Sequence, residues 1–343
     1  MKKEIWGFYP PPIGGISIYC KRLIDKLHAK DEKIVMRNFA ASDSACGYVL
    51  DVKNKLLEFL KLLFLPKRLI HAQFTNFYLL MLLYLCGWRH CIVLTLHNRR
   101  LILLNGWKRK IVNRLLRRVK YVIYNDPTYT PLLRDKFDID EQKIVILPAY
   151  ISPGKDELKG LHSDITTFIA KHELTISANA HRVIHNVYGD LYGIDQLISL
   201  MDRLVHEKCM DVGLVFCISE IFDHEYYRQC LDRINGLGLE ENFLFVIQSP
   251  VNGFEVWAAT DLFLRPTMTD MEGVSVKEAL QFGTPVVASD VCTRPKETVL
   301  YETGNADDLF RKVYPLLMQK PRVKYTPEVC VEDEILHIYS LII

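Results

Sequence analysis

Residues 261–295 read DLFLRPTMTDMEGVSVKEALQFGTPVVASDVCTRP, and this stretch decides the fold. An apolar, strand-like run at 261–267 is followed by a polar loop and then by a helix that we expect to begin near Ser275 and to end by Gly283. The sequence Gly-Thr-Pro then turns the chain into a second strand-like run at 285–290. Strand, loop, helix and strand in this order are the unit from which parallel α/β sheets are built.

The same alternation extends in both directions from this stretch. Further strand-like runs occupy residues 4–10, 33–39, 68–74, 91–97, 121–126, 143–150, 174–180, 211–219 and 242–248. Helix-period runs occupy residues 16–28, 76–85, 107–118, 193–205, 224–235 and 328–343. Pro, Gly and charged residues interrupt this rhythm at 148–160, which is typical of a linker. We therefore predict two successive doubly wound α/β domains, at residues 1–152 and 170–325.

The composition limits the class of protein. A chain of 343 residues suits two domains, and 49% apolar with 24% charged residues is typical of a folded protein. The nine cysteines form no CxxC pair and no Cys/His cluster, which argues against a disulfide framework or a zinc site and fits a reducing compartment. No leader-like segment stands before residues 4–8, and the most apolar stretch, 77–88, is shorter than the ~20 residues that span a bilayer. We expect a cytoplasmic protein that is soluble or peripheral to a membrane.

The formal net charge of +2 conceals an asymmetry, because residues 1–150 carry +14 and the remainder carries −12. Within the basic half, the run at 107–118 combines an apolar side with six basic residues: Lys108, Arg109, Lys110, Arg114, Arg117 and Arg118. Residues 56–69 add a second apolar segment with a basic end. This pattern favours contact with anionic lipid, worth ~1 kcal/mol per basic residue at the surface. The alternative is a helix packed on the sheet with its charges in solvent. We expect no nucleic-acid partner, since no RNA- or DNA-binding module is recognisable and the acidic half would oppose binding.

The loop within 261–295 has features suited to an anionic ligand. Gly273 stands just before the expected helix, whose first N–H groups lack intrahelical partners and carry partial positive charge. Asp270 and Glu278 are separated by seven residues, which places one carboxylate at the mouth of the loop and the other about one turn inside the helix. An ordinary strand–helix loop with a capping Ser275 is the alternative interpretation.

At these residues the sequence resembles the retaining GT-B glycosyltransferases, family four in particular. Members of that family carry an acidic residue, seven further residues and a glutamate at the nucleotide site of the second domain, and here the pattern is Asp270-Met-Glu-Gly-Val-Ser-Val-Lys-Glu278-Ala. The loop is most similar to a bacterial surface-polysaccharide subgroup, and GTPVVASD at 283–290 fits as well. The resemblance implies the GT-B architecture: two Rossmann-like doubly wound domains with a cleft between them, and residues 326–343 returning to the first domain as a helix.

The resemblance also implies roles in binding the donor, a sugar nucleotide. Glu278 would accept hydrogen bonds from the ribose hydroxyls. Asp270 would lie on the sugar side, near the sugar hydroxyls or the anomeric carbon, as a catalytic residue. Backbone N–H groups of three residues would bind the diphosphate: Glu272, Gly273 and Val274. The same donor site would include Ser275 and Lys277.

Two elements of the first domain match the family as well. In the family, the loop that corresponds to Pro10-Pro-Pro-Ile-Gly14-Gly15 lies under the donor phosphates and beside the acceptor, and paired glycines let the backbone approach a ligand closely. A structural turn is the alternative, and the dinucleotide fingerprint GxGxxG is absent. His97 ends a predicted strand at the edge where open α/β sheets bind ligands, and the family has a histidine there that contacts the sugar. A loop-capping histidine is the alternative. Asp126 has a comparable but weaker position.

The sequence departs from the family at the residues that grip the diphosphate. Typical members have an arginine and a Lys-Gly pair after the first strand of the second domain; here Tyr192 stands in the place of the lysine and Arg182 matches only loosely. The cations near the nucleotide loop that can compensate are Arg265, Lys277 and Arg294. Solvated surface charges are the alternative interpretation.

Taken together, these observations predict a retaining, metal-independent glycosyltransferase without a cofactor. It would transfer a sugar from a nucleoside-diphosphate sugar to a hydroxyl of a membrane-associated, lipid-linked saccharide in O-antigen or capsule assembly, at the inner face of the plasma membrane. One rival is a degenerate GT-B protein acting as a partner subunit, which the missing Lys-Gly pair favours and Glu278, Asp270 and His97 oppose. The other is a GT-B-fold sugar-nucleotide epimerase or hydrolase, which needs further catalytic carboxylates and histidines.

Overall fold

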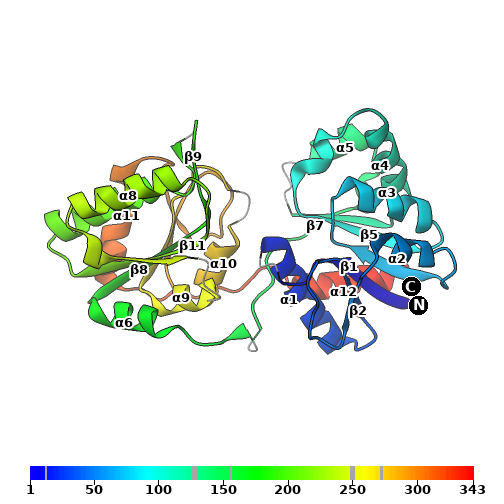
Figure 1. The fold of residues 1–343 in the computed structure, drawn as a ribbon, viewed down its shortest axis with the longest axis horizontal. Helices are drawn as coiled ribbons and strands as arrows, with labels where there is room; N and C mark the ends of the chain where they lie inside the picture. The colour runs from blue at the N-terminus through cyan, green and yellow to red at the C-terminus, as the bar shows by residue number, and fades with distance from the viewer. Residues whose placement is uncertain (12–13, 126–129, 155–156, 188, 248–251, 271–272) are drawn as a thin grey trace. The chain divides into compact units, whose positions relative to one another are not determined.

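A computed structural model describes residues 1–11, 14–125, 130–154, 157–187, 189–247, 252–270 and 273–343. It divides the chain into two compact units. The first comprises Met1–Ile151 together with Glu328–Ile343, and the second comprises Ser152–Pro327. Each unit contains its own parallel β-sheet with helices against both faces (Figure 1). The predicted α/β class with two Rossmann-like domains is confirmed.

The sheet of the first unit has seven strands in the order β3-β2-β1-β4-β5-β6-β7, and all neighbouring strands are parallel. The order reverses at β1, as it does in doubly wound nucleotide-binding sheets. The strands are β1 (Lys2–Gly7), β2 (Val35–Asn38), β3 (Val49–Asp51), β4 (Arg68–Ala72), β5 (Cys91–Leu96), β6 (Tyr121–Tyr124) and β7 (Ile144–Ile146).

Successive strand residues of the first unit face opposite layers of helices. Trp6 and Leu94 pack with α2 to α5, whereas Ile5 and Val93 pack with α1 and α12. Short 3-10 turns, η1 (Arg99–Leu103) and η3 (Glu141–Lys143), follow β5 and precede β7. The helices are α1 (Gly15–Lys30), α2 (Lys55–Lys61), α3 (Phe77–Cys86), α4 (Gly106–Arg118), α5 (Thr130–Phe137) and α12 (Val331–Ile342).

The sheet of the second unit has six parallel strands in the order β12-β11-β8-β13-β14-β15, with the reversal at β8. Its strands are β8 (Leu174–Val183), β11 (Val212–Ile221), β12 (Phe243–Ile247), β13 (Leu262–Arg265), β14 (Val286–Ser289) and β15 (Val299–Tyr301). A small antiparallel pair lies between β8 and α7, formed by β9 (His185–Asn186) and β10 (Gly189–Asp190).

The helices of the second unit also form two layers. Leu214 and Leu264 face α7, α8 and α11, whereas Val215 and Phe263 face α6, α9 and α10. The helices are α6 (Ser163–Lys171), α7 (Ile194–Asp202) with the turn η5 (Arg203–Glu207), α8 (His224–Gly236) followed by η6 (Glu240–Asn242), α9 (Gly253–Ala259), α10 (Val274–Gln281) and α11 (Ala306–Gln319).

The last helix, α12, belongs to the first unit although it follows the whole second unit in sequence. Ile335 and Tyr339 of α12 are in the same apolar cluster as Leu23 of α1, and Lys26 forms an ion pair of 3.0 Å with Glu332. Within the described part of the chain, no helix combines the length and the apolarity needed to cross a membrane.

Candidate functional site

The start of α10 requires a glycine for two separate reasons. Gly273 is the N-cap residue and has φ +64°, in the left-handed region that residues with a Cβ disfavour. A Cβ on Gly273 would also lie 2.2 Å from Nη1 of Arg294, so any side chain there would force the guanidinium to move. The guanidinium of Arg294 therefore passes directly over the backbone at the N-terminus of α10.

Two arginines and one aspartate meet beside this helix start, and we call them the Arg265–Asp270–Arg294 cluster. Oδ2 of Asp270 accepts hydrogen bonds from Nε of Arg265 at 3.0 Å and from Nη1 of Arg294 at 2.9 Å. The side chains of Arg265 and Asp270 are 11% and 12% exposed, and that of Arg294 is fully buried. Two guanidinium groups against one carboxylate leave the cluster with a net positive charge.

Electrostatics keep Asp270 ionised in the cluster. Burial raises the pKa of its carboxyl group, but the positive charges of Arg265 and Arg294 outweigh burial and hold that pKa below its ordinary value. Asp270 is thus an anion that binds two cations.

Arg294 retains an unused hydrogen-bond donor. Its Nε donates to the carbonyl of Ser289, at the end of β14, at 3.4 Å, whereas its buried Nη2 has no hydrogen-bond partner among the described residues. A buried charged donor without a partner is costly, and an anionic oxygen is the acceptor that satisfies a guanidinium best. The cluster is therefore suited to an anion such as a phosphate.

Arg265 is fixed from a second direction by residues of β8 and its following loop. Its Nη1 donates to Oδ1 of Asn179 at 2.9 Å, and its guanidinium lies 5.4 Å from the centre of the Tyr192 ring. The ring of Tyr192 thus supports the neighbouring cation of Arg265.

Helix α7, which follows β8 and the β9–β10 pair, already has a carboxylate at its N-terminus. Asp190 accepts hydrogen bonds from the backbone N–H groups of Ile194 and Asp195, and from the hydroxyl of Tyr226 at 2.9 Å. By contrast, the N-cap residue of α10 is a glycine and has no side chain to cap the helix. The N-terminus of α10 is therefore better suited to an anionic ligand than that of α7.

The remaining predicted donor residues are placed as follows. Val274 begins α10, Lys277 is half-buried on its first turns, and Glu272 lies outside the described residues. Arg182 is near the end of β8, where its Nε is 2.8 Å from Oε2 of Glu220, so its charge is neutralised locally. The two buried polar side chains of α10 are Ser275 and Glu278.

In the first unit, Gly14 and Gly15 begin α1 after β1. The backbone N–H of Gly14 donates to Oγ of Ser17 at 2.9 Å, and this hydroxyl donates back to the carbonyl of Gly14 at 3.0 Å. A Cβ on Gly15 would meet no atom within 4 Å, and the φ of −168° at Gly14 suits any residue. Packing within the described chain therefore does not require either glycine.

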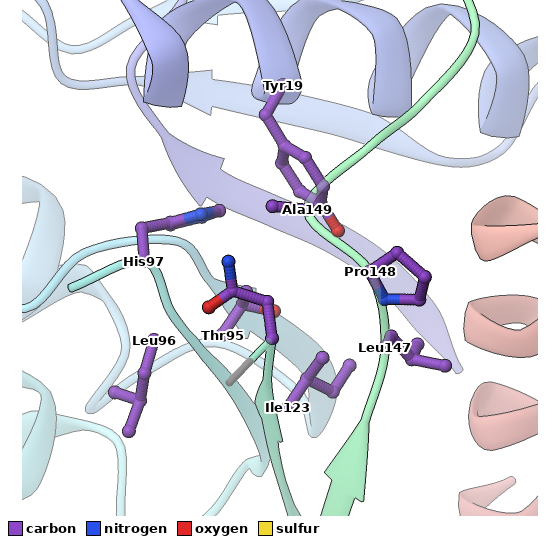
Figure 2. Close-up of a pocket in the computed structure, with 9 residues that line it drawn as sticks. Tyr19, Thr95, Leu96, His97, Ile123, Leu147, Pro148 and Ala149 are labelled. Atoms are coloured by element: carbon purple, nitrogen blue, oxygen red, sulfur yellow. The ribbon is translucent and has the colours of Figure 1, made fainter. Parts of the chain in front are cut away.

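His97 follows β5 and lines a small pocket at the carboxyl edge of the first sheet. Figure 2 shows Tyr19 reaching from α1 toward the segment that carries Pro148 and Ala149, with His97 beside it. The ring centres of Tyr19 and His97 are 4.9 Å apart in an edge-on arrangement. Burial lowers the pKa of His97 to about 4, so the imidazole is neutral at pH 7.

The six predicted surface cations lie on α4, which buries Val112, Leu115 and Leu116 against the sheet. Arg117 pairs with Asp138, and Arg118 donates to the carbonyl of Tyr84 at 3.0 Å. Arg109 donates from Nε to the carbonyl of Lys136, and Lys108 lies over the Phe77 ring. The side chains of Lys110 and Arg114 form no ion pair, hydrogen bond or ring contact with the described residues.

Exposed aromatic residues accompany these cations. Trp107 at the start of α4 is 58% exposed and Tyr78 of the adjacent α3 is 61% exposed, both beside the ring of Phe77. Trp88, just after α3, is 62% exposed. We call the outer faces of α3 and α4 the aromatic–basic surface.

Comparison with known proteins relates this site to a family of glycosyl transferases. Residues 185–315, which contain the Arg265–Asp270–Arg294 cluster and α10, match the family of glycosyl transferases group 1. Among proteins of curated function, none matches the sequence. Solved structures with the GT-B fold are similar over nearly the entire chain at low sequence identity, and three of them serve as examples.

Anabaena Alr3699/HepE in complex with UDP and glucose shares 16% identity with a TM-score of 0.67, over 100% of this chain and 98% of that chain. The lipopolysaccharide outer core galactosyltransferase WaaB shares 12% identity with a TM-score of 0.61, over 100% of both chains. A glycosyltransferase from Rickettsia africae shares 13% identity with a TM-score of 0.69, over 99% of this chain and 98% of that chain. The fold is GT-B. The GT-B architecture expected from the sequence is thus confirmed, and its second unit contains the glycosyltransferase group 1 match.

Several residues of this GT-B chain that shape the site were not predicted. Asn179 and Tyr192, which hold Arg265, have no motif of their own. Gln73 accepts a hydrogen bond from Nε2 of His97 at 2.7 Å, and it is fully buried. The only available sequence signal was a polar residue within the strand-like run 68–74. Within the described residues, no group of three or more His, Cys, Asp or Glu side chains is arranged to hold a metal ion.

Proposed function

We propose that this protein is a retaining, metal-independent glycosyltransferase that transfers a sugar from a nucleoside-diphosphate sugar to a hydroxyl of a lipid-linked saccharide at a membrane surface. The observation that carries the proposal is the Arg265–Asp270–Arg294 cluster at the N-terminus of α10, inside the segment that matches glycosyl transferases group 1. This is the position at which a diphosphate meets both helix-terminal N–H groups and guanidinium groups.

The proposed chemistry follows from these charges. Negative charge accumulates on the diphosphate as it leaves the sugar, and preorganised cations and backbone N–H groups stabilise that charge most effectively in a site with little water. Arg294 is fully buried and its Nη2 lacks a partner among the described residues. Its guanidinium therefore need not move or break another hydrogen bond when negative charge develops on the diphosphate. Asp270 orients both guanidinium groups in this proposal, and the sugar-side role expected for it is secondary.

His97 contributes on the first unit. Its imidazole is neutral, and we assign it to a sugar hydroxyl in the adjoining pocket as a hydrogen-bond partner. A neutral imidazole binds a hydroxyl without adding a cation near a reaction centre that becomes positively charged.

The acceptor proposal rests on the aromatic–basic surface. Exposed tryptophan and tyrosine next to unpaired cations suits the interface of an anionic membrane, where aromatic rings lie at the headgroups and basic residues meet lipid phosphates. An enzyme held there acts on an acceptor carried by a lipid. This supports a cytoplasmic location at the inner face of the plasma membrane and a part in surface polysaccharide assembly.

A thermal-shift screen against UDP, GDP, dTDP, CMP and their sugar conjugates tests the donor proposal. Ligand binding to the folded state raises the unfolding temperature, because a ligand at about 100 times its Kd adds ~2.7 kcal/mol of stability. UDP is the first ligand to test because Anabaena Alr3699/HepE was crystallised with it. We expect a shift with one nucleoside diphosphate that is lost in Arg294→Met and kept in Arg228→Met, whose arginine is 66% exposed on α8.

Absence of a shift with every nucleotide overturns the donor proposal. A shift without sugar transfer to any lipid-linked acceptor favours the rival function, a binding subunit that has lost catalysis. Tyr192 in the place of the usual lysine is the observation behind that rival.

A further inference from the structure

A chain of buried hydrogen bonds connects α12 with His97 in the first unit. The hydroxyl of Tyr339 lies 2.7 Å from Nδ1 of His71, and Nε2 of His71 lies 3.0 Å from Nε2 of Gln73. Oε1 of Gln73 then lies 2.7 Å from Nε2 of His97. His71 and Gln73 are completely buried, and Tyr339 is 1% exposed. The connection therefore runs through the interior of the unit and has no access to water at its centre.

The chemistry of each atom sets the direction of these bonds. Burial lowers the pKa of His71 to about 3, so its ring is neutral and carries one proton. The amide nitrogen of Gln73 can only donate, so Nε2 of His71 accepts and the proton of His71 is on Nδ1, where it is donated to Tyr339. The hydroxyl of Thr95, 2.6 Å from the same Nε2, shares the single lone pair of that nitrogen with the amide of Gln73.

The far end of Gln73 follows from this orientation. With its nitrogen directed to His71, its oxygen is directed to His97, and an amide oxygen can only accept. Nε2 of His97 must therefore be protonated. Because the ring is neutral, Nδ1 of His97 carries a lone pair, and no described group donates a hydrogen bond to it.

We propose that Gln73 is a positioning residue that holds the proton of His97 on Nε2 and so presents Nδ1 as a hydrogen-bond acceptor for a hydroxyl of the substrate. In this arrangement the nitrogen of the Gln73 amide is directed to His71 and its oxygen to His97. The assignment to a substrate hydroxyl rests on the proposed glycosyl transfer, whereas the position of the proton does not.

The same geometry explains why a polar side chain is buried at position 73. A buried amide without partners is costly, and here each end of Gln73 meets one imidazole. A hydrogen bond at one ring nitrogen of a histidine determines which nitrogen has the proton, and therefore whether the other nitrogen donates or accepts.

The test is ¹⁵N NMR of the imidazole nitrogens in the full-length protein at pH 7, with His97 assigned by comparison with His97→Asn. We expect Nε2 of His97 to have the chemical shift of a protonated nitrogen and Nδ1 that of an unprotonated one. A protonated Nδ1 with an unprotonated Nε2 overturns the proposal without reference to activity.

Two substitutions extend the test. Gln73→Glu places a carboxylate next to Nε2 of His97, so we expect both nitrogens of His97 to be protonated at pH 7 and transfer to fall at least tenfold in kcat with little change in KM for the donor. If this variant does not fold, Gln73→Met removes the oxygen, and His97 should then populate both neutral forms. Unchanged His97 shifts in the folded variant overturn the proposal.

The outcomes separate this inference from the proposed function. If the wild-type NMR result is as expected but the protein transfers no sugar, the glycosyl transfer fails and the role of Gln73 in fixing His97 stands. If transfer is observed but His97 is protonated on Nδ1, the proposed glycosyl transfer is supported and the proposed role of Gln73 is wrong.

Discussion

Gly273 lacks a side chain at the point where Arg294 crosses the start of α10: a Cβ there would lie 2.2 Å from Nη1 of the arginine. Gly273→Ala must therefore displace Arg294 and also adopt a left-handed backbone conformation, which costs about 1–2 kcal/mol. We expect a destabilised but folded protein whose affinity for the nucleoside diphosphate falls roughly ten- to hundredfold, since a hydrogen bond to a charged group is worth about 1.5–3 kcal/mol. Calorimetric titration measures the affinity.

Gly283→Ala is the matched control for this substitution. Gly283 also has positive φ, at +84°, but a Cβ there meets only the carbonyl of Val323 at 3.5 Å, an ordinary contact. It should lose similar stability and retain nucleotide affinity. Equal affinity losses in both variants would remove Arg294 from the nucleotide site.

Asp270→Asn should reduce the dependence of the free energy of unfolding on pH below about pH 4. Because the pKa of Asp270 in the folded protein lies below its ordinary value of 3.8, the stability that this carboxylate contributes is complete above about pH 4 and is lost as pH falls through the folded pKa. The variant leaves two buried guanidinium groups without their anion, which costs about 3–5 kcal/mol at neutral pH. Thermal unfolding should show a wide gap between wild type and variant at about pH 6 that narrows below about pH 4. A gap of constant width would mean that Asp270 is not the ionised partner. Asp232→Asn, at an exposed position on α8, controls for the loss of a carboxylate.

Glu278→Gln tests the proposed ribose contact. Glu278 is buried on α10, and replacing its carboxylate by an amide removes a charged acceptor while keeping the shape. We expect the Kd for the nucleoside diphosphate to rise roughly tenfold or more, with the fold unchanged by circular dichroism. Glu240→Gln, an exposed position on η6, should leave the Kd unchanged. Wild-type affinity in Glu278→Gln would exclude Glu278 from the site.

Gly15→Ala separates packing from ligand approach at the start of α1. No atom of the described chain lies within 4 Å of a Cβ there, and alanine is better than glycine in a helix by about 0.5–1 kcal/mol. Stability should therefore stay the same or increase, while transfer activity falls if a substrate approaches this backbone. Gly47→Ala, another glycine of the first unit with open space around its Cβ, is the control. Full activity in Gly15→Ala would indicate that the glycine pair has only a structural role, as a turn.

The aromatic–basic surface predicts a salt-sensitive interaction with anionic liposomes. Lys110→Glu with Arg114→Glu removes two cations that have no acidic partner among the described residues, at ~1 kcal/mol each, so co-sedimentation should weaken by roughly thirtyfold or more. Arg228→Glu with Arg311→Glu, two exposed cations of the second unit, is the control. Equal loss in both double variants would indicate that net charge alone attracts the protein.

The central strands were predictable because a strand buried on both faces is a continuous apolar run. β5 and β13 are examples, and each lies between two other strands of its own sheet. The short edge strands β3 and β15 were not predicted, because each has three residues, too few to show a recognisable pattern of apolar residues. Helix α11 was also missed, because Pro315 within it is usually a sign that a helix has ended.

The site was predictable only where its residues are close in sequence. Asp270, Gly273 and Glu278 share one loop and one helix, so their spacing was informative, and Arg265 could be named beside them. That Arg265 and Arg294 share a single oxygen of Asp270 depends on where β13 and β14 end, which spacing does not give. The contact between His71 and Tyr339 joins residues at opposite ends of the chain and leaves no signal in either segment.

The return of α12 to the first unit has a consequence during synthesis. A nascent chain folds from its N-terminus as the ribosome extends it. Residues 1–151 emerge first, but Ile335 and Tyr339, which complete their core, emerge only after the whole of Ser152–Pro327 has been translated. Until then the apolar surface of α1 that α12 covers is open to water and to chaperones. A transcript cut short before codon 328 therefore yields no finished first unit, whatever the state of the second.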